Sequence, residues 1–178
     1  MLARIYNFPT DNVEIDLSQH DTVFKIPLLT ENQFMKSRCS EKEKQELLPV
    51  FIDLFSLHHS YQDGGIPALE QDLNILRHPF MVEALQMFLN GESPEQTNKK
   101  LSRKVQSSRV SGKALLEKML IQRAVLSMAV GNLPGTTHKL LMDLLDFDDP
   151  TCVVDILFEA LYQSRPEKSG DIIPFESC

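Results

Sequence analysis

From residue 40 onward, apolar residues recur every three or four positions, which is the spacing of one face of an α-helix. The first such series consists of Leu47, Leu48, Phe51, Leu54, Phe55 and His58. Ser40 and Glu43 precede it with the spacing of a capping box, and Pro49 predicts a kink or a break near its start. The longest series predicts a helix over 114–130, with a single stripe of Leu116, Leu120, Ala124 and Met128 that we expect in the core.

Three predicted connectors share one sequence pattern, a glycine followed three residues later by a proline. They are Gly64-x-x-Pro67, Gly91-x-x-Pro94 and Gly131-x-x-Pro134. Glycine supplies the left-handed turn that ends one helix, and proline pre-sets φ for the first turn of the next. Each connector therefore predicts the end of one helix and the start of another. Residues around the last two also agree at a constant separation: Ala84 with Ala124, Thr97 with Thr137, Lys99 with Lys139, and Leu101 with Leu141. Either a true duplication or the reuse of one helix connector explains this agreement.

The two ends of the chain have different patterns. Residues 13–17 alternate apolar and polar, and residues 23–26 are β-branched or aromatic, so we expect an extended arm over 1–38 with one or two short strands. Residues 102–113 are polar and predict a loop or a frayed helix end. Asp149-Pro150 opens a last predicted helix with Val153, Leu157 and Leu161, followed by a flexible tail over 164–178. The expected protein is all-α, with six or seven short helices in one helical domain over 39–163.

The composition narrows the class of protein. A hydrophobic fraction of 42% and a charged fraction of 24% are typical of a soluble globular protein. The net charge of -7 argues against general nucleic-acid binding, because phosphates repel an acidic surface. No apolar run approaches the roughly 20 residues that span a bilayer, and the amino-terminal residues do not resemble a signal peptide. Three cysteines without motif spacing fit a reducing compartment. We expect a cytoplasmic protein, with peripheral attachment at the inner membrane as an alternative.

Catalytic and metal-binding patterns are weak in this sequence. No Ser/His/Asp set, phosphate-cradling glycine loop or paired carboxylates occur in a recognisable context, so we expect no enzyme activity and no cofactor. His58, His59 and Asp63 lie close in sequence, and such side chains can bind metals. Adjacent residues on a helix point about 100° apart, however, which opposes a shared ion. A metal- or ligand-binding protein or a small helical enzyme remains the alternative in a different class.

Basic residues concentrate between 99 and 113. Six of the 18 lysines and arginines lie there: Lys99, Lys100, Arg103, Lys104, Arg109 and Lys113. Such a cluster fits a docking surface for an acidic protein or an anionic membrane, or else a solvated loop. We take Lys99, Lys100, Arg103 and Lys104 as candidate partner-binding residues. Glu70 and Asp72 are further candidates, because they follow Leu69 on a predicted helix and are turned away from its apolar face.

The order of these motifs is similar to that of a known family. Residues Gly65-Ile66-Pro67-Ala68-Leu69-Glu70, then His78-Pro79-Phe80-Met81, then the segment 89–95 around Gly91 and Pro94 resemble the cytoplasmic region of the flagellar motor stator A subunit, the MotA/PomA family. The segment 120–145 resembles the part of that family that follows its last membrane helix. The resemblance covers less than half of the 178 residues. It departs from the family in lacking four membrane helices, and Gln62 stands where the family has a basic residue.

The resemblance implies a role for Glu70, which matches an acidic residue that contacts the rotor in that family. It also implies that a chain without membrane spans binds a motor component but conducts no ions. The expected function is therefore a non-enzymatic protein–protein interaction module, a soluble stator-like accessory of the bacterial flagellar motor. Its partner would be a rotor or stator component. A generic helical adaptor unrelated to motility is the alternative, and a homo-oligomer is also left open.

Overall fold

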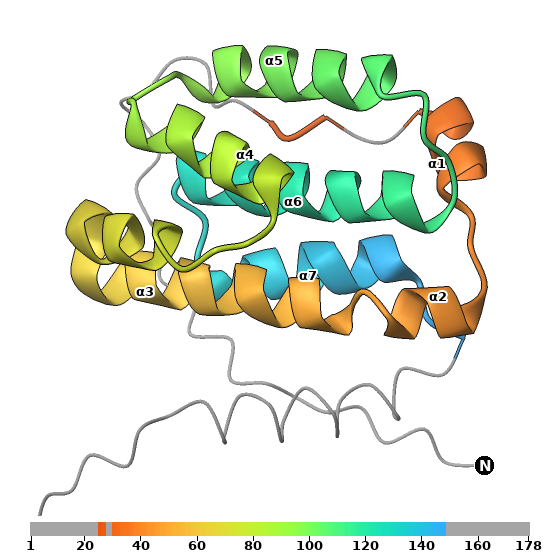
Figure 1. Cartoon of the computed structure of the whole chain (residues 1–178), viewed down its shortest axis with the longest axis horizontal. Helices are drawn as coiled ribbons and strands as arrows, with labels where there is room; N and C mark the ends of the chain where they lie inside the picture. Colours follow the sequence, from red (N-terminus) through yellow and green to blue (C-terminus); the bar gives the residue numbers. More distant parts are fainter. Residues whose placement is uncertain (1–24, 28–29, 149–178) are drawn as a thin grey trace, which may run out of the picture.

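The computed structural model describes residues 25–27 and 30–148, and over these residues the chain forms seven α-helices and no strand (Figure 1). The helices are α1 Glu31–Ser37, α2 Glu41–Gln45, α3 Leu48–Leu73, α4 Pro79–Leu89, α5 Pro94–Ser107, α6 Lys113–Ala129 and α7 Pro134–Leu145. This confirms the all-α prediction. Within this described part, no helix is long and apolar enough to cross a membrane.

Helix α6 forms the centre of the bundle. It contacts α1, α3, α4, α5 and α7, and the other helices surround it (Figure 1). The predicted stripe of Leu116, Leu120, Ala124 and Met128 is buried, as are Leu115, Met119, Ile121, Val125 and Leu126 on its other sides. A helix that is apolar on nearly all sides is stable only when other helices enclose it. The sequence of α6 therefore requires the central position that it occupies.

Two of the predicted connectors have the same geometry. Gly91 and Gly131 follow α4 and α6 with φ of 71° and 76°, and each amide donates to the carbonyl three residues earlier at 3.0 Å. Pro94 and Pro134 then start α5 and α7. The left-handed backbone explains the glycines, because a side chain there is strained. The connector predictions for these two sites are confirmed.

The two hairpins α4–α5 and α6–α7 also share one pattern of burial. Residues separated by the same interval are buried in both: Phe80 and Leu120, Met81 and Ile121, Ala84 and Ala124, Leu85 and Val125, Thr97 and Thr137, Leu101 and Leu141, Val105 and Leu145. The equivalence predicted from the connectors thus extends through the core. The two hairpins are structural repeats of each other.

The connector in α3 differs from these two. Its positive φ is at Gly65 (66°), two residues before Pro67, and the preceding Gly64 keeps helical backbone. The break turns the chain so that α3 consists of two segments, and Pro67 lies in the first turn of the second segment. That segment ends at Leu73, and Leu76 precedes α4 in a loop. The predicted break at Pro49 is confirmed, because α2 ends at Gln45 and Pro49 lies in the first turn of α3.

Two predictions need correction. The arm was expected to be extended up to residue 38, but Glu31–Ser37 forms α1, which begins with a capping box of Thr30 and Gln33 and packs on α6. Residues 102–113 were expected to be a loop or a frayed end, and residues 108–112 do form the connector between α5 and α6. The first part of this range is wrong, because α5 is helical up to Ser107, with Val105 buried beside Leu101. The remainder of the arm (1–24 and 28–29), the predicted helix after Pro150 and the tail over 164–178 lie outside the described residues.

Candidate protein-interaction surface

Helix α5 presents four basic side chains on its outer face. The Ser93 hydroxyl caps its start by accepting from the Gln96 amide at 3.3 Å, and Thr97, Leu101 and Val105 are buried against the core. The helical period places Lys99 and Arg103 opposite this inner face, and Lys100 and Lys104 along its flank. Lys99, Lys100, Arg103 and Lys104 are all exposed. We call these four side chains the α5 basic face.

Half of the α5 basic face is paired with carboxylates. Lys100 Nζ lies 2.6 Å from Glu92 Oε1, and Lys104 Nζ lies 2.5 Å from Glu83 Oε1 on α4. Lys99 and Arg103 form no ion pair with any of the described residues. They lie four residues apart, on the side of α5 that points directly away from its buried face. Within the described part of the chain, these two neighbouring cations are therefore open to an external partner.

The other two basic residues of the cluster do not belong to this face. Arg109 lies beyond the end of α5 with φ of 51°. Lys113 begins α6, and its Nζ lies 2.6 Å from Glu46 Oε2, a contact that raises the pKa of Lys113. The structure therefore separates the sequence cluster into the α5 basic face, Arg109 in the connector after α5, and Lys113 at the start of α6.

Glu70 and Asp72 occupy the second segment of α3. Glu70 is exposed beside the buried Leu69, as the sequence predicts, and Asp72 is partly buried. Their segment forms one end of the molecule, and α4 lies between it and α5 (Figure 1). The acidic candidates and the α5 basic face are therefore two separate surfaces.

The histidine and aspartate residues near position 60 are not brought together. His58 is buried at 2% exposure, and its Nε2 lies 2.9 Å from the Asn132 carbonyl oxygen in the connector before α7. His59 is exposed and packs edge-on against Phe55, with ring centroids 4.5 Å apart. Asp63 is exposed. Among the described residues, no group of three or more His, Cys, Asp or Glu side chains is placed to hold a metal.

The structure contains two notable cavities. The larger, about 300 Å³, lies between α1, α2 and the end of α7, and Cys39 is one of its lining residues. The pKa of the Cys39 thiol is raised, mainly by burial, so the reactive thiolate is disfavoured. The smaller cavity, about 180 Å³, lies beside α5 and includes Ser102, Gln122 and Arg123.

Arg123 is the functional candidate that the sequence reasoning missed. The sequence contained a signal for it: Arg123 lies among apolar residues that are expected in the core, and an arginine is costly to bury there without a partner. Only the packing of α5 and residues 25–27 around α6 shows that this side chain borders a cavity.

Comparisons with protein families, with curated proteins and with solved structures found no match to this chain.

Proposed function

We propose that this protein is a non-enzymatic protein–protein interaction module that docks on an acidic partner through the α5 basic face. The observation that supports the proposal is the neighbouring pair Lys99 and Arg103 on the outer side of α5. Both side chains are exposed, and neither has a carboxylate partner in the described part of the chain. The buried residues of α5, not these two, hold the helix on the bundle, so the two cations are not required for the fold.

Electrostatic attraction from such a face acts mainly on the rate and specificity of association. Lys100 and Lys104 also belong to this face, but their ion pairs with Glu92 and Glu83 reduce the positive charge that a partner would meet. Lys99 and Arg103 should therefore contribute most of the attraction.

The partner that we put forward is a component of the bacterial flagellar motor, with the protein acting as a soluble stator-like accessory. The support is the order of motifs described above, from Gly65 through Glu70 and His78 to Pro94. Glu70 would provide a second contact, on a surface separate from the α5 basic face. Its side chain is exposed, as a contact residue must be.

The test is a titration of the purified protein against purified rotor and stator proteins at several salt concentrations. We expect binding that weakens steeply with salt, because exposed charges are screened over about 8–10 Å at physiological ionic strength. Lys99→Gln and Arg103→Gln should each weaken binding. Lys139→Gln is the matched control, because Lys139 is exposed at the position of α7 that is equivalent to Lys99.

Three results would overturn parts of the proposal. If binding does not change with salt or in the Lys99 and Arg103 variants, the α5 basic face is not the docking surface. Equal losses with Lys139→Gln would show a general charge effect. The absence of binding to every motor component would refute the motor accessory, whereas salt-sensitive binding to another acidic protein would identify a helical adaptor unrelated to motility.

A further inference from the structure

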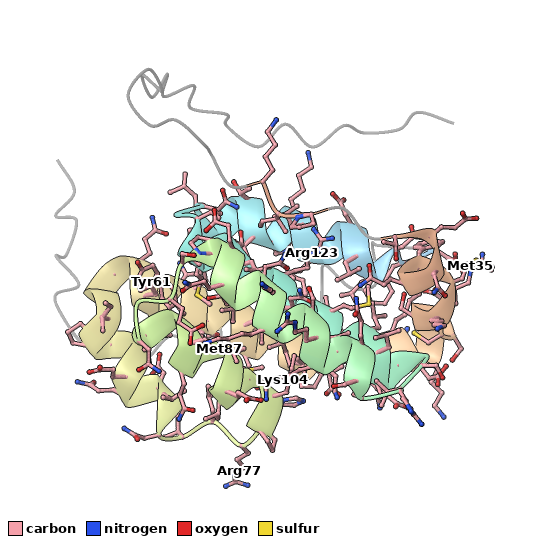
Figure 2. The ribbon with its side chains drawn as sticks, turned by 90° about the horizontal axis from the view of Figure 1, so that it is seen from above. Met35, Tyr61, Arg77, Met87, Lys104 and Arg123 are labelled. Atoms are coloured by element: carbon pink, nitrogen blue, oxygen red, sulfur yellow. The ribbon has the colours of Figure 1, made fainter. Side chains whose placement is uncertain are left out.

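Arg123 is a partly buried cation that has no carboxylate partner among the described residues. It lies among the helices close to α5, whereas Arg77 projects from an edge of the molecule (Figure 2). Burial lowers the pKa of the Arg123 guanidinium, and no ion pair joins it to any residue that the structure describes. A guanidinium removed from water is costly unless hydrogen bonds and an opposite charge compensate it. An anionic group that bound to Arg123 would therefore compensate the cost of burying its charge.

The cavity beside Arg123 is lined by polar side chains together with apolar ones such as Met119 and Leu126. Gln122 Nε2 donates to Asn98 Oδ1 and to Ser102 Oγ, both at 2.9 Å, which holds the Gln122 amide against α5. Gln106 also borders the cavity from α5. Over the described residues, the nitrogen donors of Arg123 and Gln106 make no hydrogen bond. These donors are available to an oxygen-bearing ligand.

The size of the cavity limits the ligand. Its volume of about 180 Å³ is smaller than the roughly 300–1,000 Å³ of pockets that enclose whole small molecules. A single carboxylate side chain fits this space, and the planar guanidinium matches a carboxylate with two parallel hydrogen bonds.

The position of the cavity connects it to the α5 basic face. Asn98, Ser102 and Gln106 line the cavity and recur every four residues along α5. Lys99 and Arg103 are the next residues in sequence after Asn98 and Ser102, so their stripe lies about 100° further around the same helix. A protein segment paired with these two cations therefore passes close to the cavity.

We propose that the cavity at Arg123 is an anchor site for one aspartate or glutamate side chain of an acidic protein segment that lies along α5. This inference rests on the proposed function and deepens it. The carboxylate receives hydrogen bonds from the Arg123 guanidinium, while neighbouring acidic residues of the same segment pair with Lys99 and Arg103. Arg123 thus selects the register of the partner, and the outer cations supply attraction.

The experiment uses the full chain and two probes, a labelled ten-residue oligoglutamate peptide and sodium acetate, at constant ionic strength. Peptide affinity is measured by fluorescence anisotropy, and the Arg123 Nε resonance is followed by NMR. We expect both probes to shift that resonance. Arg123→Gln should weaken peptide binding by roughly ten- to a hundredfold, because the variant removes the charge-assisted hydrogen bonds to the carboxylate. Arg77→Gln, which removes an equal charge at an exposed distant site, should change it little.

A second pair of variants keeps the test valid if Arg123→Gln fails to fold. Gln106→Glu places a carboxylate at the cavity, where it competes for Arg123, and Gln96→Glu adds the same charge at an exposed position of α5 outside the cavity. We expect Gln106→Glu to weaken peptide binding several-fold more than Gln96→Glu.

The outcomes separate this inference from the proposed function. Peptide binding that depends on Lys99 and Arg103 but not on Arg123 or Gln106, with no acetate effect on the Arg123 resonance, would overturn the anchor and leave the basic face intact. An acetate shift that is lost in the Gln106→Glu variant, without any peptide or partner binding, would retain the carboxylate site and overturn the docking surface.

Discussion

Two buried threonines occupy equivalent positions in the repeated hairpins, but among the described residues only one of their hydroxyls has a hydrogen-bond partner. Thr137 Oγ1 lies 2.6 Å from Ser127 Oγ, and Asn132 Nδ2 donates to the same Ser127 oxygen at 2.9 Å. The position equivalent to Ser127 in the first hairpin is Met87, and Thr97 Oγ1 is buried without a hydrogen bond in the described structure. Both threonines are fully buried. Thr137 therefore serves as a matched control for Thr97 within the same protein.

Replacing each threonine by valine exchanges the hydroxyl for a methyl group of nearly the same shape. A buried polar group without a partner costs about 1–3 kcal/mol, so Thr97→Val should stabilise the fold by about 1 kcal/mol. Thr137→Val breaks the hydrogen bond to Ser127 and should destabilise the fold by a similar amount, about 1 kcal/mol. For a chain of this length, such changes correspond to about 2–4 °C in melting temperature.

The assay is urea unfolding of the parent and the two single variants, followed by circular dichroism, with a thermal melt of each. Opposite signs for Thr97→Val and Thr137→Val are the expected result. Equal destabilisation by both changes would show that the Thr97 hydroxyl is hydrogen-bonded in solution. The account of how the two hairpins differ would then be wrong.

Three other predictions follow from the same structure. Glu70→Lys should leave the melting temperature nearly unchanged, because an exposed carboxylate contributes little to folding, but should impair binding in a titration with motor proteins. Gly91→Ala should destabilise the fold by about 1–2 kcal/mol in urea unfolding because φ is 71°, whereas Gly135→Ala in α7 meets open space and should stabilise it slightly. Burial lowers the pKa of His58 and His138 below the ordinary value of 6.5. As pH falls, the unfolded chain therefore binds more protons than the folded chain. The free energy of unfolding should be highest above pH 6.5 and decrease below it.

The helix boundaries were largely readable from the sequence because local chemistry determines them. Gly91 and Gly131 end helices through a left-handed backbone that other residues rarely adopt, and Pro94 and Pro134 begin helices through a pre-set φ. These effects act within one turn of the chain. The capping box at Thr30 is equally local, but α1 has only 7 residues and no long apolar series, so the extended pattern before it dominated the prediction.

The burial pattern of α6 was partly predictable, because its stripe from Leu116 to Met128 has helical spacing. Its central position was not, since it depends on five other helices packing around it. The length of α5 was missed for a related reason. The polar residues after Leu101 suggest a loop, but burial of Val105 against the bundle extends the helix.

The candidate site depends on contacts between residues far apart in sequence. The sequence identified Lys99 and Arg103 as basic residues, but the structure showed that Lys104 is paired with Glu83 while these two have no ion pair among the described residues. Arg123 became a candidate only where residues 25–27, α5 and α6 meet at one cavity. Local signals determine where helices begin and end because they act over a few residues. Charge pairing, burial and cavities are decided by tertiary packing, which brings together side chains that no local pattern relates.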